Sequence, residues 1–540
     1  MSRFNYSRRH TTETKVGKIG IGGNNPIRIQ SMTNTSTMDT DGSVRQALNI
    51  IQAGGELVRL TTQGVREAEN MGNIRKALSE RGSDTPLVAD VHFNPAAAFK
   101  AVETCEKVRI NPGNFVDPAR TFKKLDFTDE EYSAEIERIR EIFVPFLKKC
   151  KEHGTAIRLG VNHGSLSDRI MSRYGDTPQG MVESALEYLR ICKEEGFDNV
   201  VISIKSSNVG VMVKTVELLA KKMEEENMHF PLHLGVTEAG DGEDGRIKSA
   251  VGIGTLLGEG LGDTIRVSLT EDPENEIPVA KKLRDYILSR NGHELIVDTE
   301  IDNIDLSRNK AEKIPGFEKI SYPIVVGLDI LKIPANWHYA NAENEIPVYQ
   351  DNLPMVLETS NMNIPGSMAS WIERFYASGS KNPVILKVSY KDTDIENLQI
   401  KASADLGALL LWGYGSGIWI EAPNVPKKDI ESLSLGILQA TRLRISKTEY
   451  IACPGCGRTL FELQKTLKEV KEATKEMKGL KIGVMGCIVN GPGEMADADF
   501  GYVGAGPGRV SLYKGKELVK KNIPSENAIS ELLALISSKD

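Results

Sequence analysis

The chain contains few cysteines, and they are unevenly placed. Six cysteines in 540 residues are too few for a scaffold held together by disulfides. Cys105, Cys150 and Cys192 lie singly in helix-like segments, where a buried small apolar residue is the ordinary interpretation. The other three lie close together near the end of the chain and require another explanation.

Long hydrophobic runs and a strong charge of one sign are also absent. No apolar run approaches the length needed to cross a membrane, and no apolar core follows the early arginines as in a signal peptide. We therefore expect a cytoplasmic protein. The formal net charge of −7 gives the whole surface no reason to bind nucleic acid or an anionic membrane. Any anion site is thus expected to be local.

A strand-like run followed by a helix-like segment recurs between residues 27 and 270. The strand-like runs are 27–33, 56–64, 86–94, 107–114, 156–164, 199–207, 231–240 and 264–270. This alternation predicts a parallel sheet, and eight units over about 250 residues predict a closed (β/α)8 TIM barrel. An open doubly wound sheet is the main alternative. The absence of a glycine-rich dinucleotide fingerprint after the first strand weakens it.

Charged and polar residues gather at the carboxyl ends of these predicted strands, where TIM barrels form their active sites. The candidates are Arg59, Asp90, His92, Arg109, Asn111, Arg158, Asn162, Lys205, Glu238, Arg266 and Ser268. A single arginine at a strand end usually belongs to a salt bridge or to a solvated rim. Five cations on five strands, with only two acids among them, favour an anion site suited to a diphosphate or several phosphates.

A glycine-bearing stretch, 248–263, precedes the last predicted strand. It could add backbone N–H donors to the anion site at a helix start. The alternative is that its glycines allow close packing of helices.

Cys453 and Cys456 form a C-P-G-C turn, and Cys487 follows later in the chain. Two thiolates on one tight turn with a third nearby suit an iron–sulfur cluster or zinc. No histidine follows residue 338, so the usual Cys/His set of a structural zinc site is incomplete. Glu494 is the candidate fourth ligand, an exchangeable one, because a hard carboxylate suits such an iron poorly. The alternative interpretation of Glu494 is a solvated acid in a turn.

The predicted elements suggest three domains. We expect a TIM-barrel substrate-binding domain at 1–290, a central α/β insert at 291–445 that could be barrel-like, and a small α/β iron–sulfur domain at 446–540. The insert contains strand-like runs at 322–330, 354–360, 383–390 and 417–423 but no ligand-spaced cluster.

Several long motifs resemble one known family. They are EAGDGEDGRIKSAVGIGTLLGEGLGDTIRVSLT, LGVNHGSL, ADVHFNP, VRINPGN, CPGC and GCIVNGPGE. They are similar to the 4-hydroxy-3-methylbut-2-enyl diphosphate synthases of the non-mevalonate isoprenoid pathway, and the insertion resembles their three-domain form. The resemblance covers the barrel and the carboxyl-terminal domain.

The resemblance implies a reductive ring opening of 2-C-methyl-D-erythritol 2,4-cyclodiphosphate, with two electrons arriving singly from ferredoxin or flavodoxin. It implies a [4Fe–4S] cluster on Cys453, Cys456, Cys487 and Glu494, and a proton donor at Glu238. The diphosphate-binding residues that it implies are Arg59, Arg109, Arg158, Lys205, Arg266 and Ser268, with Asn111, Asn162 and His92 nearby.

The barrel and the cluster domain must meet for this chemistry. A homodimer would allow the cluster domain of one chain to cap its partner's barrel. Our hypothesis is closure within one chain, with the insert in place of the partner's barrel. Two other functions remain open at this point: a cluster carrier without enzymatic activity, and a barrel transferase such as a pterin-binding synthase with a structural zinc.

Overall fold

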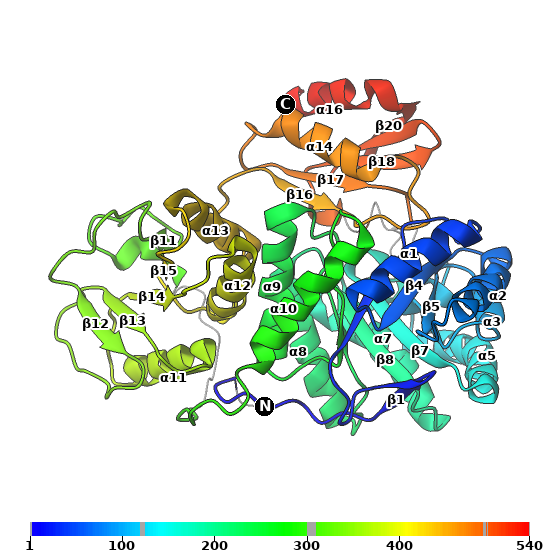
Figure 1. Ribbon diagram of the computed structural model, residues 1–540, viewed down its shortest axis with the longest axis horizontal. Helices are drawn as coiled ribbons and strands as arrows, with labels where there is room; N and C mark the ends of the chain where they lie inside the picture. Colours follow the sequence, from blue (N-terminus) through cyan, green and yellow to red (C-terminus); the bar gives the residue numbers. More distant parts are fainter. Residues whose placement is uncertain (1–2, 119–124, 300–308, 490–492, 494, 539–540) are drawn as a thin grey trace. The chain divides into compact units, whose positions relative to one another are not determined.

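The computed structural model describes residues 3–118, 125–299, 309–489, 493 and 495–538 (Figure 1). The chain divides into two compact units. The barrel unit comprises His10–Asp241, Gly262–Ala280 and Thr448–Asp540. The central unit comprises Met1–Arg9, Gly242–Leu261 and Lys281–Lys447. The three domain boundaries expected from the sequence stay predictions.

Eight parallel strands form the barrel. They are β3 (Arg28–Met32), β4 (Leu57–Thr62), β5 (Leu87–Val91), β6 (Lys107–Ile110), β7 (Ala156–Asn162), β8 (Val200–Lys205), β9 (His233–Leu234) and β10 (Thr264–Ile265). Their order is β8-β7-β6-β5-β4-β3-β10-β9, and a bridge between Ile202 on β8 and Leu232 beside β9 closes the ring. The predicted TIM barrel is thus confirmed.

Helices connect these strands, and local capping explains where several of them begin. They are α1 (Thr40–Ala53), α2 (Val65–Glu80), α3 (Pro95–Ala101), α4 (Pro112–Phe115), α5 (Asp129–His153), α6 (Asp168–Tyr174), α7 (Pro178–Glu194) and α8 (Val209–Glu225). Thr128 forms a capping box with Glu131 at the start of α5, and Ser167 caps α6. These caps fix where the chain turns back from the strand ends.

An amino-terminal hairpin covers the opposite end of the barrel. Its strands β1 (Thr14–Val16) and β2 (Ile19–Ile21) pair antiparallel. Val16 and Ile21 pack with Leu57, Val88 and Val201 at the starts of the barrel strands. The hairpin therefore buries apolar side chains at that end, away from the carboxyl ends that carry the polar residues.

The end of the barrel unit is a small five-stranded α/β domain, drawn orange to red in Figure 1. Its strands are β16 (Glu449–Ala452), β17 (Lys481–Met485), β18 (Phe500–Gly506), β19 (Arg509–Lys514) and β20 (Glu517–Pro524), and its helices are α14 (Leu463–Thr474) and α16 (Ala528–Ser537). The first three strands are parallel, and the last two continue the sheet antiparallel. The expected α/β domain is confirmed.

The central unit also contains a parallel sheet. Its strands are β11 (Ile324–Val325), β12 (His338–Asn341), β13 (Met355–Glu358), β14 (Val384–Ser389) and β15 (Gly417–Glu421), accompanied by α11 (Ile364–Ala377), α12 (Ile395–Leu411) and α13 (Lys427–Ala440). The order β11-β15-β14-β13-β12 is the cyclic order of a barrel opened between β11 and β12. The sheet is thus α/β as expected, and β12 is a strand that the sequence patterns did not predict.

Glycines in the stretch 248–263 serve helix packing. They lie on α9 (Gly242–Gly258), which packs against α12 within the central unit. A Cβ atom at Gly254 would lie 2.8 Å from the Cβ of Ala404, and one at Gly407 would lie 2.8 Å from a methyl of Val251. Such distances are too short for real side chains, so these glycines permit the close approach of the two helices.

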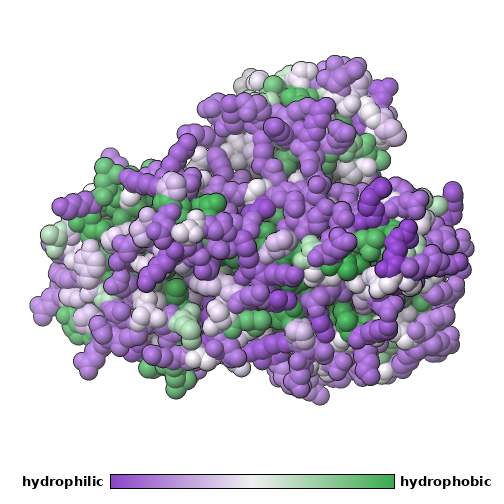
Figure 2. Space-filling model, in the orientation of Figure 1, coloured by the Kyte–Doolittle hydropathy of each residue, from purple (hydrophilic) through white to green (hydrophobic). Residues whose placement is uncertain are grey.

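The described helices include none that is both long enough and apolar enough to span a bilayer. Hydrophilic residues cover most of the face seen in Figure 2, and apolar residues appear there as separate patches.

Candidate active site

One cavity joins the mouth of the barrel to the carboxyl-terminal domain. Its lining includes Arg59, Asp90, His92, Arg109, Arg158, Asn162, Lys205, Glu238, Arg266, Ser268, Cys453, Cys456 and Cys487. All of these residues were singled out by the sequence. Both contributing parts belong to the barrel unit, and closure within one chain in solution stays a hypothesis.

The side chain of Arg109 passes over the neighbouring strand, β7, at Gly160. Its guanidinium donates to the carbonyl of Gly160 at 2.8 Å and to Oδ1 of Asp90 at 3.2 Å, and it also contacts His92. A Cβ atom at Gly160 would lie 2.3 Å from Nε of Arg109. Gly160 therefore opens the path along which this cation reaches the cavity.

Lys205 on β8, two strands along from Arg109, follows the same pattern. A Cβ atom at Gly235 would lie 2.6 Å from its Nζ. Lys205 is 5% exposed and makes no ion pair with any residue in the described ranges. Burial, and then the charges of Arg59 and Arg158, hold the pKa of Lys205 well below its ordinary value.

Arg158 is the most isolated cation of the cavity. It is 2% exposed, and its Nε and Nη1 have no hydrogen-bond partner in the part of the chain that the structure describes. Burial and the neighbouring Arg59 and Arg109 lower its pKa far below the ordinary value. A buried charge without a partner is costly, so a guanidinium in this setting is typical of a site that binds an anion.

Of the remaining two arginines of the mouth, Arg266 is bound by a buried carboxylate. Arg266 donates twice to Glu276, at 2.9 and 2.8 Å, and Glu276 also accepts from Ser31. Glu276 outweighs the effect of burial and raises the pKa of Arg266, whereas burial lowers the pKa of Arg59 to about 10. Arg266 is thus fixed by a carboxylate.

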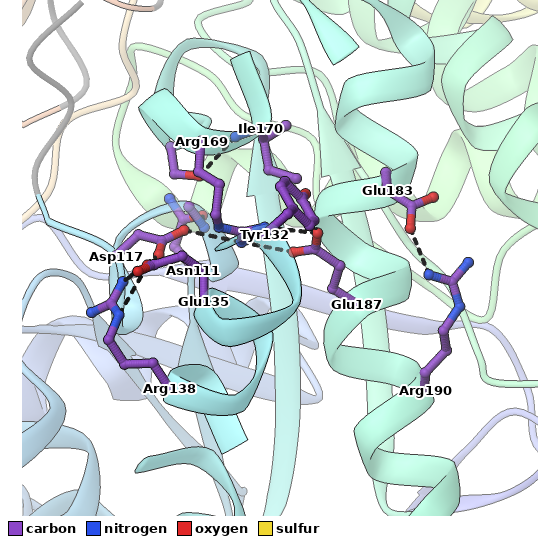
Figure 3. A network of polar contacts seen from close by, with 12 residues as sticks. Asn111, Asp117, Tyr132, Glu135, Arg138, Arg169, Ile170, Glu183, Glu187 and Arg190 are labelled. Atoms are coloured by element: carbon purple, nitrogen blue, oxygen red, sulfur yellow. Dashed lines mark hydrogen bonds and ion pairs between the residues drawn. The ribbon is translucent and has the colours of Figure 1, made fainter. Parts of the chain in front are cut away.

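Asn111 is the one predicted binding residue that is not among those lining the cavity. Its side chain caps α4 through Gly113 and donates to Ser165 Oγ at 2.7 Å, which joins the loops after β6 and β7. Behind these loops Arg169 binds Glu187 at 2.7 and 2.8 Å and Asp117 at 3.2 Å (Figure 3). The structure therefore gives Asn111 a loop-holding position.

Glu238 lies in a strained turn after β9. Its φ of 49° is in the left-handed region, which a residue with a side chain rarely adopts, and it is 5% exposed. The following residue, Ala239, bridges to Ala452 of the carboxyl-terminal domain. Nearby, the backbone N–H of Thr270 donates to the carbonyl of Gly240 at 2.9 Å. Strain of this kind concentrates at functional sites.

The three cysteines reach the cavity because β16 and β17 are parallel neighbours. The C-P-G-C turn follows β16 and Cys487 follows β17, so both loops leave the same edge of the sheet. The backbone N–H of Gly486 donates to Sγ of Cys453, and Thr270 of the barrel donates to the Cys453 carbonyl at 2.9 Å. The barrel thus contacts the thiol loop directly.

The three cysteines are half-buried at the edge of the cavity. Burial raises the pKa of Cys487 to about 11 and raises that of Cys453 further. Within the described ranges no three His, Cys, Asp or Glu side chains form a ready-made ion site. Glu494, the expected fourth ligand, lies outside the described residues. Its neighbour Gly493 is described, and a Cβ atom there would lie 1.7 Å from the carbonyl oxygen of Gly164 on the barrel.

Comparison with known proteins agrees with this arrangement. Residues 11–281 match the GcpE TIM-barrel domain, and residues 449–538 match the GcpE protein C-terminal domain. The chain belongs to the GcpE family. Proteins named 4-hydroxy-3-methylbut-2-en-1-yl diphosphate synthase (flavodoxin) are 52% identical in Parabacteroides distasonis, over 99% of both chains, and 44% identical in Leptospira interrogans, over 99% of this chain and 97% of that one.

The resemblance predicted from the motifs is therefore confirmed, and the GcpE chain is an oxidoreductase of this synthase family. Sequence reasoning missed Arg458, which lines the cavity from the carboxyl-terminal domain. Its guanidinium donates to Oδ2 of Asp90 at 3.4 Å and to the Asp90 carbonyl at 3.1 Å. A cation two residues after Cys456 was the available signal.

Proposed function

We propose that the chain converts 2-C-methyl-D-erythritol 2,4-cyclodiphosphate into 4-hydroxy-3-methylbut-2-en-1-yl diphosphate and water in the non-mevalonate isoprenoid pathway. One observation carries the proposal: buried cations of the barrel and three thiols of the carboxyl-terminal domain line a single cavity. A cluster carrier has no use for the cations, and a transferase with a structural zinc has no use for thiols in its active site.

The cations would hold the diphosphate. Arg158 and Lys205 are buried without carboxylate partners in the described residues, so an anion between them removes a mutual repulsion that burial strengthens. Arginine forks suit paired phosphate oxygens. Arg59, Arg109, Arg266, Ser268, Asn162 and His92 would complete this binding site, and Asn111 would support it through its loop.

Cys453, Cys456 and Cys487 fit a [4Fe–4S] cluster, with Glu494 as the fourth ligand. Thiolates are the ligands that such clusters take, and these three side chains line one cavity. When bound, the cluster would supply two electrons one at a time. The names of the relatives support flavodoxin as the donor. The cytoplasmic location and the homodimer stay predictions.

Glu238 would deliver a proton to the departing hydroxyl. Its carboxyl group faces the cavity that Cys487 also lines, and the strained turn fixes its position. The released phosphate oxygen would stay among the cations, which stabilise the negative charge as the ring opens. Two C–O bonds break, one to the phosphate and one to the departing hydroxyl, and side chains of this chain would serve the leaving oxygen of each.

The decisive experiment is anaerobic reconstitution of the full chain. We expect bound iron and sulfide, a visible charge-transfer band, and turnover of the cyclodiphosphate with reduced flavodoxin. Cys487→Ser should lose the band and the activity, whereas Cys105→Ser, a change of another buried cysteine far from the cavity lining, should keep both. A fully loaded, reducible enzyme that does not turn over the substrate would overturn the proposal.

Closure within one chain has its own test. Because one barrel unit supplies both halves of the cavity, mixing a Cys453→Ser chain with a Glu238→Gln chain should restore almost no activity. Restoration of a substantial part of wild-type activity would show that the two halves come from different chains.

A further inference from the structure

Arg458 is the only cation that the carboxyl-terminal domain contributes to the described cavity lining. It is 8% exposed, and its guanidinium donates two hydrogen bonds to Asp90 at the end of β5. A buried arginine needs a partner, and this one finds it across the boundary between the thiol loops and the barrel.

Asp90 accepts hydrogen bonds from two guanidinium groups at once. Its Oδ1 accepts from Arg109, while its Oδ2 and its backbone carbonyl accept from Arg458. Burial raises the pKa of Asp90, but the surrounding cations, Arg59 and Arg109 first, outweigh it and keep the carboxylate ionised. Asp90 therefore links the thiol-bearing domain to a cation of the anion site.

The position of this link in the barrel is informative. The other contacts of the carboxyl-terminal domain include Thr270 with Cys453 and Asp241 with Lys471, both on the loops after β9 and β10. In the ring of eight strands, β5 lies four places from β9, on the opposite side of the mouth. Arg458 therefore holds the domain at the side of the mouth across from those contacts.

We propose that Arg458 is a positioning residue that shares the Asp90 carboxylate with Arg109, which weakens the hold of that carboxylate on Arg109 and favours the binding of a diphosphate there. On this assignment Asp90 anchors two arginines and is not itself a ligand of the substrate. The inference rests on the proposed function, since it takes the diphosphate as the anion. Without Arg458, more of the charge of Asp90 competes with the diphosphate for Arg109.

The test is a double-mutant cycle in full-length, cluster-loaded enzyme, with binding of inorganic diphosphate measured by calorimetry in the absence of reductant. Arg458→Met should weaken binding by about 10- to 100-fold, the size of one hydrogen bond to a charged group. In the Asp90→Asn background, Arg458→Met should weaken it less than about threefold, because the competing carboxylate is gone. The control is Arg509→Met, which changes an exposed arginine of the same domain.

Two outcomes would overturn the inference: Arg458→Met binds diphosphate as tightly as wild type, or Asp90→Asn weakens binding equally in both backgrounds, as loss of a substrate ligand would. If Arg458→Met fails to fold or to load its cluster, Arg458→Lys replaces it in the cycle. Lysine keeps the charge but cannot reach the carboxylate and the carbonyl as a fork, so a smaller loss of affinity is expected, and no loss would count against the inference. A wild-type enzyme that binds no diphosphate would instead refute the proposed anion site.

Discussion

The barrel and the central sheet each carry a lysine on a parallel strand but surround it differently. At the barrel mouth, Lys205 ends β8 and has no carboxylate partner in the described residues. In the central sheet, Lys387 on β14 pairs with Glu358 on β13 at 2.9 Å and Glu421 on β15 at 3.5 Å, and it lies 4.8 Å from the ring centre of Trp419. One sheet leaves its cation for a ligand, and the other neutralises it.

The pKa shifts of the two lysines have opposite signs for this reason. Burial and neighbouring cations hold the pKa of Lys205 well below its ordinary value. Burial also acts to lower the pKa of Lys387, but hydrogen bonding and attraction to Glu358 outweigh it and raise that pKa. The direction of the pKa shift, together with the groups that cause it, therefore distinguishes a candidate functional lysine from a structural one.

Arg169 shows that the barrel itself can compensate a buried arginine where no ligand is involved. Glu187 and Asp117 surround it, Tyr132 donates to Glu187, and all three charged side chains are 4% exposed or less (Figure 3). Arg158 lies on β7 of the same barrel, and its Nε and Nη1 have no hydrogen-bond partner in the described residues. The contrast therefore does not depend on comparing different folds.

The largest effect is expected from Arg169→Met. The change leaves Glu187 and one oxygen of Asp117 buried without their arginine, so the free energy of unfolding should fall by about 3–5 kcal/mol. Urea unfolding of the purified variant measures this loss. Arg190→Met is the control, because its side chain is 39% exposed and its partners Glu183 and Glu226 are 15% and 30% exposed, so the change should cost no more than about 1 kcal/mol. Equal losses would remove the distinction between compensated and exposed pairs.

Arg158→Met should act in the opposite direction on stability. The ligand-free protein loses a buried charge without partners, so its free energy of unfolding should rise by about 1 kcal/mol. Activity should fall, with kcat/KM for the cyclodiphosphate reduced by about 100- to 1000-fold. Steady-state kinetics and thermal unfolding of the same preparation measure both. A variant that is less stable and fully active would reverse our interpretation of the mouth.

We expect anion binding to depend on pH because of Lys205. Burial and neighbouring cations lower the pKa of Lys205, and a diphosphate beside it acts to raise that pKa because it favours the charged form. Binding should therefore take up a proton, and affinity should fall as pH rises, by at most about tenfold per pH unit from this group. Calorimetry in two buffers of different ionisation enthalpy counts the proton.

Lys205→Arg is the matched variant for this measurement. Arginine stays protonated, so proton uptake by the protein should decrease while the titration of diphosphate itself stays the same. The difference between the two proteins therefore reports Lys205 alone. Identical proton uptake in both would show that Lys205 is already fully charged before the anion binds.

The sequence predicted the parts of the site that repeat or cluster along the chain. Eight strand-like runs ending in polar residues predicted the barrel, and the spacing of Cys453, Cys456 and Cys487 predicted one thiol site. Arg458 was missed because its partner Asp90 is 368 positions away, and nothing local marks such a pair. Asn111 shares a strand end with Arg109, yet its side chain caps a helix, a choice made by local backbone geometry.

Short elements were missed for a similar reason. The strand β12 has four residues with partly exposed side chains, which is too little for an alternating pattern to appear. Gly160 and Gly235 make room for cations on neighbouring strands, but a glycine within a strand has several ordinary explanations. Only the positions of the facing side chains distinguish among them.

The smallest effect is expected from Lys387→Met, the counterpart of the barrel changes. Glu358 and Glu421 remain 44% and 48% exposed, so water can solvate them when the lysine is gone. The free energy of unfolding should therefore change by about 1 kcal/mol or less, and kcat/KM by less than about twofold. Steady-state kinetics beside Arg158→Met make the comparison direct. A loss of activity as large as that of Arg158→Met would mean that the central sheet also serves the reaction. Pairing of a strand lysine with carboxylates would then be no sign of a purely structural role.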